Sequence, residues 1–199
     1  REAWKERKMD DRVVLSHDDL RKALVRIANE IVEKNPDGEA IALVGVHTRG
    51  AILSARIHTL VGELTGSEVP LGDLDISFYR DDIERREPLT APVVHASHLD
   101  FELEGRTVIL VDDVLYTGRT VRAGIEALFD YGRPDRVQLA VLVDRGHREL
   151  PIRPDYVGKN LPTASGERVN VRLEEVDDRD EVAIAAATAG ATANGEEER

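Results

Sequence analysis

The chain has 199 residues, no cysteine and a formal net charge of −12, which excludes disulfides and zinc–cysteine sites and argues against sequence-blind binding to nucleic acid. Its hydrophobic fraction of 41% and charged fraction of 33% are those of a globular domain that is large enough to hold a core. No apolar run is long enough to cross a bilayer and no signal peptide is visible, so we expect a cytoplasmic location.

Three segments divide the chain by composition. Residues 1–12 are polar and are expected to fray, whereas residues 13–185 alternate buried strands with amphipathic helices and are predicted to form one domain. Residues 186–199 consist mostly of Ala, Thr, Gly and Glu, a composition that predicts a disordered tail. The alternation predicts an α/β fold with a mostly parallel central sheet flanked by helices.

Residues 16–35 are predicted to form the first helix. Ser16 is placed to cap its N-terminus, and Asp19 stands at the acidic position of a capping box. Apolar residues recur at helical spacing and form one stripe, made of Leu20, Ala23, Leu24, Ile27, Ala28, Ile31 and Val32. The opposite face carries basic and polar residues and is expected to be exposed.

The apolar run 41–46 predicts a buried strand, which leads into Thr48, Arg49 and Gly50 and then into a second helix. Backbone N–H groups at the start of such a helix and the forked guanidinium of Arg49 suit a pyrophosphate. An ordinary connection between strand and helix is the alternative interpretation of these three residues.

Residues 69–79 alternate weakly and predict a further strand. The stretch that follows, residues 80–98, is long for a loop in a compact domain and is predicted to be a lid. Its arginines are placed to reach phosphates when the lid closes, although solvated surface charge explains Arg85 and Arg86 equally well. His95 and His98 have no identifiable third metal ligand and are interpreted as surface or hinge residues.

The stretch 108–120 is the centre of the prediction. Four apolar residues, three of them β-branched, predict a strand buried on both faces, and Asp112 and Asp113 follow at its C-terminal end. Next come the small and hydroxyl-bearing residues 117–120 and then a helix pattern. Strand, acid pair, hydroxyl-rich turn and helix form a phosphate-site layout, because the free N–H groups and positive end of the helix face an anion.

The acid pair needs an explanation, because carboxylates repel a phosphate. A ribose 5-phosphate provides one: the phosphate binds the turn, the 2- and 3-hydroxyls face Asp112 and Asp113, and magnesium balances the remaining charge. A turn with an N-capping Asp and no ligand is the alternative. A Walker A loop and a dinucleotide-binding fingerprint are excluded, since neither motif occurs in the chain.

Residues 137–143 predict the next buried strand, and the loop 144–160 that follows is dense in charged and aromatic side chains. Its start at the C-terminal end of a strand that neighbours the central one puts part of this loop over the site. Residues 169–176 and 181–185 are predicted to pair as a closing hairpin.

These motifs together resemble a known family. The stretch 108–120 is similar to the phosphoribosyl pyrophosphate (PRPP) signature of type I phosphoribosyltransferases. With residues 48–50, 79–82, 144–153 and 157–160 added, the chain resembles the PyrR family of bacterial pyrimidine-operon regulators over roughly residues 13–185. The resemblance implies the type I phosphoribosyltransferase fold with a hood or flap and a C-terminal hairpin, assembled as a homodimer or a larger homo-oligomer.

The resemblance also implies two activities. One is the transfer of phosphoribosyl from PRPP to uracil, which gives UMP and pyrophosphate and uses Mg²⁺. The other is UMP- or UTP-responsive binding to the leader of pyrimidine-gene messenger RNA, which controls expression by attenuation or at translation. A purine-type phosphoribosyltransferase without an RNA role remains the alternative, because the choice of base depends on the loop that begins at Asp144.

Roles for individual residues follow from the resemblance. Catalysis is assigned to Asp112, Asp113 and Arg80, and the two aspartates are also the magnesium ligands, directly or indirectly. The contacts to PRPP or UMP are assigned to Thr48, Arg49, Gly50, Val114, Leu115, Tyr116, Thr117, Gly118, Arg119, Thr120, Tyr156 and Val157. Within this set Thr48 and Arg49 hold pyrophosphate, residues 117–120 hold the 5-phosphate, and uracil lies against Tyr156 and Val157.

The RNA face that the resemblance implies joins the first helix to the loop 144–160. The matching basic residues are Arg26, Arg148, Arg153 and Lys159. Relatives carry a Thr and a His on the first helix where this chain has Val25 and Asn29, and the side chain of Val25 has no hydrogen-bond donor. A dimer rim or a solvated surface is the alternative role for the four basic residues.

Overall fold

The computed structural model describes residues 11–36, 40–79, 97–164 and 166–185. Most of the segment expected to fray, residues 80–96 of the predicted lid and the predicted tail lie outside the described residues. The elements, in chain order, are β1 (Arg12–Leu15), α1 (His17–Lys34), β2 (Ile41–Val46), α2 (Arg49–Thr65), β3 (Leu71–Leu74), β4 (Thr107–Leu115), α3 (Arg119–Phe129), β5 (Arg136–Asp144), β6 (Tyr156–Asn160), β7 (Arg168–Arg172), α4 (Glu174–Asp177) and β8 (Glu181–Ala185).

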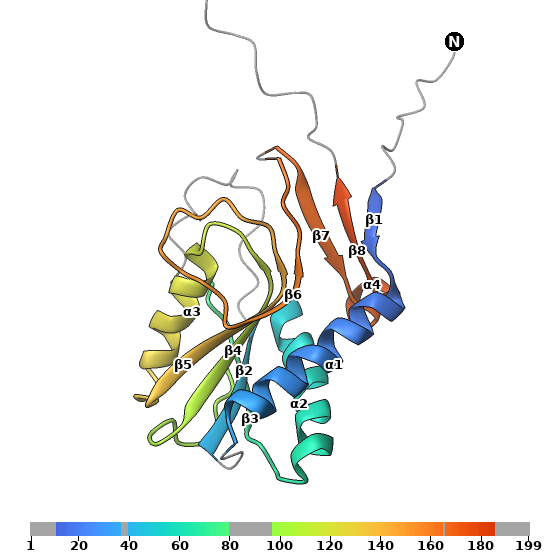
Figure 1. The fold of residues 1–199 in the computed structure, drawn as a ribbon. Helices are drawn as coiled ribbons and strands as arrows, with labels where there is room; N and C mark the ends of the chain where they lie inside the picture. The colour runs from blue at the N-terminus through green and yellow to red at the C-terminus, as the bar shows by residue number, and fades with distance from the viewer. Residues whose placement is uncertain (1–10, 37–39, 80–96, 165, 186–199) are drawn as a thin grey trace, which may run out of the picture.

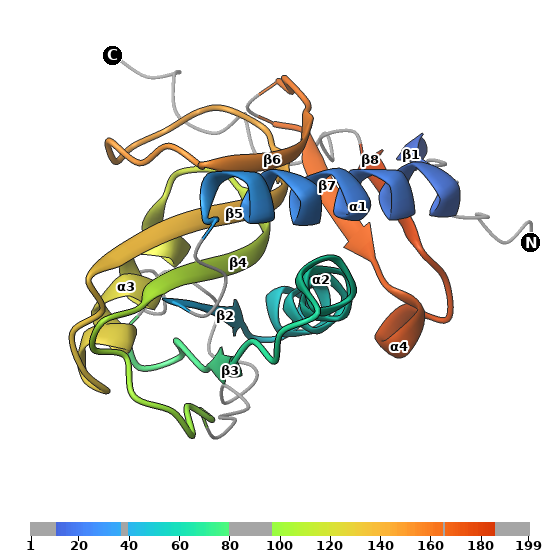
Figure 2. The same cartoon turned by 60° about the horizontal axis from the view of Figure 1, so that its bottom comes forward.

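Five parallel strands form the main sheet in the order β3-β2-β4-β5-β6. Helices α1 and α2 cover one face of this sheet and α3 covers the other (Figures 1 and 2). The predicted α/β architecture, a parallel sheet flanked by helices, is confirmed. Within the described part of the chain, no helix is both long enough and apolar enough to cross a membrane.

The central strand β4 contributes to two cores, because successive side chains of a strand point to opposite faces. Ile109 and Val111 lie in the core beside α1 and α2, whereas Val108 and Leu110 lie in the core beside α3. All four side chains are at most 1% exposed. The consecutive apolar residues therefore fix β4 at the middle of the sheet, and the acid pair is held at its C-terminal end.

Helix α1 begins with the predicted capping box. The Asp19 N–H donates to the Ser16 hydroxyl at 3.3 Å, and the Ser16 N–H donates to the Asp19 carboxylate at 3.1 Å. These bonds satisfy two backbone N–H groups near the helix start that would otherwise lack partners. The predicted apolar stripe is buried against the sheet, so the opposite face of α1 is exposed.

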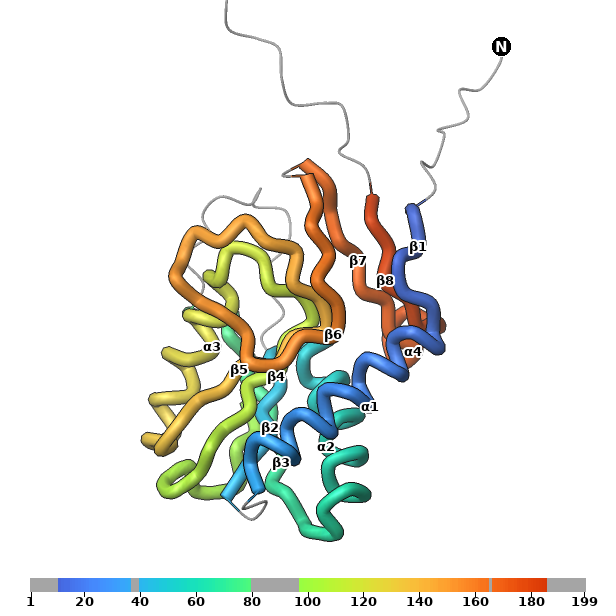
Figure 3. The backbone as a smooth tube through the Cα atoms, viewed as in Figure 1, coloured from blue at the N-terminus to red at the C-terminus, as the bar shows by residue number. Residues whose placement is uncertain are grey.

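Strands β1, β8 and β7 form a second, antiparallel sheet, which we call the hood together with α4 (Figure 3). The sequence analysis does not predict β1, which begins at Arg12 inside the segment expected to fray. Pairing with β8 orders this strand, and the neighbouring Asp11 accepts a hydrogen bond from Arg172 of β7. The frayed segment is therefore too long as predicted, because tertiary partners order its last residues.

The predicted closing hairpin is confirmed in its pairing and wrong in its bounds. Strand β7 ends at Arg172, and the short helix α4 occupies the residues that were expected to continue the strand. The carboxylate of Asp177 accepts from the Leu173 N–H at 2.9 Å, and the Asp177 N–H donates to the Leu173 carbonyl at 2.7 Å. These local bonds turn the chain away from the β ladder.

Salt bridges attach the hood to α2. The guanidinium of Arg56 binds the Glu175 carboxylate at 2.6 and 2.9 Å and the Asp180 carboxylate at 2.8 Å. Glu175 lies within α4 and Asp180 follows it, so one arginine of the main domain binds the hood at two places. These salt bridges hold the hood in position relative to α2.

Two predicted elements have different bounds in the structure. Strand β3 stops at Leu74 instead of residue 79, because Asp75 accepts from the Ser77 N–H at 2.7 Å and closes a turn. The predicted loop 144–160 ends in a fifth parallel strand, β6. A Cβ on Gly158 would lie 2.5 Å from the Leu142 carbonyl oxygen, so glycine at this position lets β6 approach β5.

Candidate active site

The two predicted anion sites meet at the C-terminal edge of the main sheet. Gly50, in the first turn of α2, lies directly against β4: a Cβ on Gly50 would be 2.5 Å from the Val111 carbonyl oxygen and 3.2 Å from the Asp112 Cα. Only glycine permits this approach. The contact brings Thr48 and Arg49 beside the acid pair, as the prediction of one shared site requires.

The two carboxylates of the acid pair, Asp112 and Asp113, have different surroundings. Asp112 is 5% exposed, whereas Asp113 is half-buried and lines a cavity. The N–H of Asp113 donates to Asp112 Oδ1 at 2.9 Å, and the N–H of Val114 donates to Asp113 Oδ1 at 2.8 Å. Burial raises the pKa of the Asp113 carboxyl, and the nearby positive charge of Arg49 opposes that rise.

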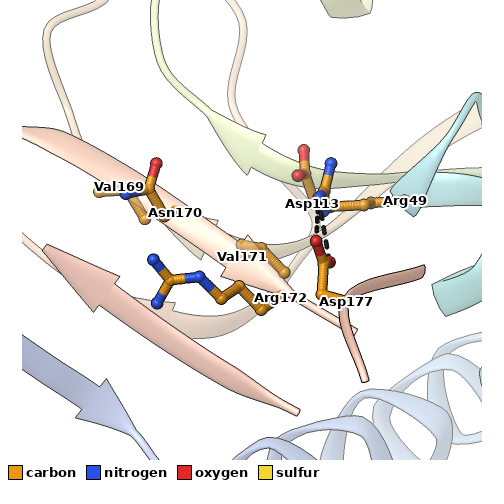
Figure 4. A pocket seen from close by; sticks show the side chains of 7 residues that line it. All are labelled: Arg49, Asp113, Val169, Asn170, Val171, Arg172 and Asp177. Atoms are coloured by element: carbon orange, nitrogen blue, oxygen red, sulfur yellow. Dashed lines mark hydrogen bonds and ion pairs between the residues drawn. The ribbon is translucent and has the colours of Figure 1, made fainter. Parts of the chain in front are cut away.

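Arg49 faces Asp113 from α2 and is bound by the hood. Its Nη2 donates to both oxygens of Asp177, at 2.9 and 3.0 Å (Figure 4). Its Nε is buried and has no hydrogen-bond partner among the described residues. An unpartnered donor at this position is what a site for a further anionic group would leave open.

The cavity between these residues has a volume of about 370 Å³ and lies between the edge of the main sheet and strand β7 of the hood (Figure 4). Its lining is formed by Arg49, Asp113, Val169, Asn170, Val171, Arg172 and Asp177. A space of this size and polar lining suits a small, charged ligand.

Residues 47–49, which we call the pyrophosphate loop after their predicted ligand, contact Asp73, which in turn contacts His98. Neither Asp73 nor His98 was assigned to the site from the sequence. His47 Nε2 lies 2.6 Å from Asp73 Oδ1, and His98 Nδ1 lies 3.3 Å from the same oxygen. The peptide bond between His47 and Thr48 is cis. His98, interpreted as a surface or hinge residue, is exposed and pairs with Asp73 across an isolated bridge.

The phosphate loop, residues 115–120, leads into α3 through Gly118, whose φ of 93° is in the left-handed region. Gly118 is the N-cap and has no side chain to occupy the first N–H groups of α3, so that helix end is suited to an anion. The Thr117 hydroxyl accepts from the Arg119 N–H at 3.3 Å. Arg119 itself pairs with Glu149, Nε to Oε2, at 2.7 Å.

A second segment, residues 144–153, packs over the phosphate loop. The Thr117 carbonyl accepts from the N–H groups of Glu149 and Leu150 at 3.0 and 3.1 Å, and a Cβ on Gly118 would lie 3.3 Å from the Ile152 side chain. The phosphate loop is therefore preformed, because its backbone is bound by the segment that follows the neighbouring strand β5. Part of loop 144–160 therefore packs against the residues predicted to bind the 5-phosphate.

Arg148, one of the four basic residues assigned to RNA binding, holds this segment in place. Its guanidinium donates to the carbonyls of Ile152 and Tyr116, each at 3.0 Å, and to Asp144 Oδ2 at 2.6 Å. The side chain is only 22% exposed. All three nitrogens are occupied within the protein, so the residue is a structural link between two loops.

Arg145 is a second structural arginine that sequence reasoning did not identify. It is 7% exposed, donates to Thr163 Oγ1 at 3.0 Å and the Glu167 carbonyl at 2.7 Å, and lies 4.1 Å from the centre of the Tyr116 ring. The next two residues, Gly146 and His147, both have positive φ and turn the chain sharply after Arg145.

Tyr156 was assigned to the uracil contact, and the structure places its side chain away from the candidate site. This side chain is fully buried in the core beside α1, where its hydroxyl donates to Gln138 Oε1 at 2.8 Å and accepts from Asn35 Nδ2 at 3.0 Å. Val157, the next residue, points to the opposite face and packs with Ile152 against the α3 core. Only Val157 therefore presents its side chain on the face that carries the phosphate loop.

Three of the four basic residues assigned to RNA are exposed on adjacent elements. Arg26 of α1 is 51% exposed and binds the Val157 carbonyl at 3.1 Å and also the Gly158 carbonyl. Lys159 and Arg153, on β6 and the segment before it, are exposed. Arg80, assigned to catalysis, lies outside the described residues.

The described residues contain no group of three or more His, Asp or Glu side chains that would hold a metal ion. Magnesium does not require such a group, because it is commonly bound by one or two carboxylates together with phosphate oxygens and water. The carboxylate of Asp113 beside the cavity fits this donor set, with Asp112 next to it in the chain.

Comparisons with known proteins agree with this geometry. The phosphoribosyl transferase domain family matches residues 14–175. The bifunctional protein PyrR of Roseiflexus sp. is 57% identical over 169 residues, which cover 85% of this chain and 91% of the relative. PyrR of Deinococcus radiodurans is also 57% identical, covering 86% and 92%, and PyrR of Listeria welshimeri is 52% identical, covering 86% and 94%.

Solved structures share the fold at low identity. The hypoxanthine phosphoribosyltransferase of Trypanosoma cruzi has a TM-score of 0.67 and 17% identity, and covers 89% of this chain and 98% of its own. A purine phosphoribosyltransferase of Pyrococcus horikoshii has a TM-score of 0.56 and 24% identity, with coverages of 77% and 89%. At these identities the likeness concerns the fold alone.

Proposed function

The chain belongs to the phosphoribosyl transferase family and, within it, to the bifunctional PyrR proteins, and from that premise we propose two activities. It transfers phosphoribosyl from PRPP to uracil, giving UMP and pyrophosphate, and it binds pyrimidine-gene messenger RNA in response to UMP or UTP. One observation carries the enzymatic proposal. The glycine contact between α2 and β4 joins an arginine-bearing helix start, an acid pair and a second helix start at one edge of the sheet.

The reaction follows from how these residues distribute charge. The 5-phosphate binds the first turn of α3, with the hydroxyls of Thr117 and Thr120 as further donors. The ribose hydroxyls face Asp112 and Asp113, and the pyrophosphate binds at Thr48 and Arg49. Asp112 and Asp113 would hold magnesium, which would supply positive charge to the leaving pyrophosphate.

The bond between ribose C1 and the pyrophosphate oxygen breaks as the bond to uracil N1 forms, through a transition state with oxocarbenium character, and the N1 proton passes to the departing pyrophosphate. No side-chain nucleophile takes part in this step. The rate comes from orientation of the two reactants, from fixed charges aimed at the leaving group and from exclusion of water. Arg80, on the lid, is proposed to approach the pyrophosphate and to complete this exclusion.

Uracil is proposed to lie against Val157, on the face of β6 that carries the phosphate loop. The Tyr156 ring is not part of this proposal, because it fills the opposite core. The Val157 carbonyl already accepts a hydrogen bond from Arg26, which links the base side of the site to the exposed face of α1. This bond is a physical connection between the two proposed activities.

The RNA proposal concerns an exposed basic face formed by Arg26, Arg153 and Lys159, without Arg148. A local face of this kind is needed because the whole chain carries a net charge of −12. RNA binding should therefore be weak in the absence of the specific leader and should fall steeply with salt. A cytoplasmic location, where such transcripts are made, is part of the same proposal.

A homodimer or larger homo-oligomer is also proposed. Phe78, Phe129 and Tyr131 are 80%, 48% and 49% exposed, and they flank the hydrogen bond between Tyr79 and Asp130. Exposed aromatic side chains that lie together are more common at subunit contacts than on the free surface of a monomer. Sedimentation of the purified chain measures the assembly.

A base panel tests the enzymatic proposal. Purified protein with PRPP and magnesium is given uracil, hypoxanthine or guanine, and pyrophosphate release is followed. We expect turnover with uracil only, and turnover with a purine alone would establish the alternative, a purine phosphoribosyltransferase. The regulatory proposal is tested by the affinity for the organism's own pyrimidine-gene leader RNA, with and without UMP, and an affinity that UMP leaves unchanged at every salt concentration contradicts it.

A further inference from the structure

We propose that Asp177 of the hood is a positioning residue for the reaction: its carboxylate binds Arg49 and must release it to the pyrophosphate group of the ligand. The inference rests on the proposed function of the pyrophosphate loop, and it adds a residue to which neither the sequence nor the family resemblance gave a role. It concerns the affinity for pyrophosphate and PRPP, and not the choice of base.

Asp177 is held in a fixed position by the hood. Its Oδ2 accepts from the Leu173 N–H at 2.9 Å, so the carboxylate is fixed to the start of α4. Helix α4 is attached to α2 through Arg56, and α2 also carries Arg49. Asp177 is therefore a built part of the site and not a mobile counterion at the surface.

The ion pair with Asp177 leaves Arg49 poorly satisfied. A guanidinium binds a carboxylate best as a fork, through two nitrogens and two parallel bonds. Here one nitrogen, Nη2, serves both oxygens of Asp177, and Nε is buried without a partner in the described part of the chain. A pyrophosphate group, which offers several oxygens, can satisfy more of these donors than Asp177 does.

The charges around the cavity also set Asp177 against a bound pyrophosphate. Asp113 and Asp177 line the same cavity as Arg49, and Asp177 is the carboxylate that binds the guanidinium (Figure 4). A bound pyrophosphate adds further negative charge in this space, and repulsion from Asp177 opposes it. Burial disfavours the charged form of Asp177, but the Leu173 N–H and the Arg49 guanidinium together lower its pKa, so it remains ionised at neutral pH.

Two consequences follow for the reaction. Asp177 lowers the affinity for PRPP, because the ligand must displace it from Arg49. It also favours the departure of the product, because the carboxylate competes for Arg49 as soon as pyrophosphate moves away. Removal of the charge should therefore lower the KM for PRPP and, where release of pyrophosphate limits turnover, lower kcat as well.

The test is pyrophosphate binding to the full chain by titration calorimetry with magnesium present. Asp177→Asn removes the charge and keeps an oxygen for the Leu173 N–H. We expect it to bind pyrophosphate about threefold to tenfold more tightly than the wild type, the range of one partly exposed ion pair. UMP, which has no pyrophosphate group, should bind with unchanged affinity.

Glu175→Gln is the matched control, because it removes a charge from the same short helix and an arginine partner, but it does not touch Arg49. It should leave pyrophosphate affinity within about twofold of the wild type. Asp177→Glu keeps the charge and should restore weak binding. Should Asp177→Asn fail to fold, Asp177→Ser removes the charge with a hydroxyl left to accept from Leu173.

The outcomes separate this inference from the proposed function. Unchanged or weaker pyrophosphate binding in Asp177→Asn overturns the inference, and so does a wild type that does not bind pyrophosphate. Tighter binding in the variant without any uracil turnover in the wild type leaves the inference standing and removes the proposed enzyme. A stronger effect of Glu175→Gln than of Asp177→Asn assigns the change to the hood as a whole and also overturns it.

Discussion

Gly50 and Val111 are in backbone contact, and this contact makes one site out of two loops. A Cβ on Gly50 would lie 2.5 Å from the Val111 carbonyl oxygen, and the backbone of β4 cannot move without disturbing the centre of the sheet. We therefore expect Gly50→Ala to lower the free energy of unfolding by about 1–3 kcal/mol, as overpacking does. It should also raise the KM for PRPP, because α2 moves away from the acid pair.

Gly62, in the same helix, provides the control for Gly50. The nearest atom to a Cβ at this position would be 3.9 Å away, so Gly62→Ala has room for its methyl group. Alanine in a helix is favoured over glycine by roughly 0.5–1 kcal/mol, so this variant should be as stable as the wild type or more stable. Urea unfolding and PRPP kinetics are measured for both variants. The same stability and the same KM for PRPP in Gly50→Ala and Gly62→Ala would contradict the role of the Gly50 contact.

Asp113→Asn should reduce uracil turnover by about 100-fold or more, because the carboxylate faces the ribose and the leaving group in the proposed site. The variant should nevertheless unfold at a higher urea concentration at pH 7. Burial raises the folded-state pKa of Asp113 above its unfolded value, so ionisation costs stability above the folded-state pKa, and this cost is lost as the pH falls from there towards the unfolded pKa. Unfolding at neutral and acid pH, compared with Asp112→Asn, measures both effects.

The alternation of apolar runs and amphipathic helices was sufficient to predict the main sheet except β6, because burial on both faces needs consecutive apolar residues such as those of β4. The acid pair and the phosphate loop were predictable for a similar reason, since their chemistry resides in adjacent residues. The close approach at Gly50 gave no separate signal, because a glycine at the start of a helix has several possible causes.

The errors concern side chains whose partners are distant in the sequence. Arg148 and Arg153 both read as free basic residues, but only Arg148 meets the carbonyls of Tyr116 and Ile152. The face on which Tyr156 lies depends on the register of β6 with β5, which the sequence does not specify. Asp177 gave no signal in the sequence, because its partner Arg49 is 128 residues away.

Arg148→Ala and Arg153→Ala should therefore separate structure from RNA binding. Loss of the Arg148 guanidinium leaves the Tyr116 and Ile152 carbonyls without this donor, so we expect a loss of about 1–3 kcal/mol in stability and slower uracil turnover. Arg153→Ala, at an exposed position, should leave stability and turnover unchanged and weaken binding to leader RNA. Equal effects of the two variants on RNA affinity alone would restore the RNA role of Arg148.

Acid should loosen the hood. Hydrogen bonds from Arg56 lower the pKa of Glu175. Burial opposes a lowered pKa in Asp180, but the Arg56 guanidinium and the Glu174 N–H together outweigh burial and lower the pKa. Because these folded-state pKa values lie below the unfolded ones, the stabilisation is complete above roughly pH 5 and is lost as the pH falls through the lowered values. Hydrogen exchange of hood amides in β7 and β8 should accelerate below about pH 4, and Arg56→Gln should remove most of this pH dependence.

Tyr156→Phe should affect stability and not the binding of uracil. The hydroxyl donates to Gln138 and accepts from Asn35 in a fully buried cluster, so its loss leaves two buried polar groups short of a partner. We expect a decrease of about 1–3 kcal/mol in the free energy of unfolding. The KM for uracil should stay within about twofold of the wild type, whereas Val157→Ala, on the opposite face of β6, should raise it several-fold. A large rise in KM for Tyr156→Phe, with Val157→Ala unchanged, would show that the base contacts the tyrosine after all.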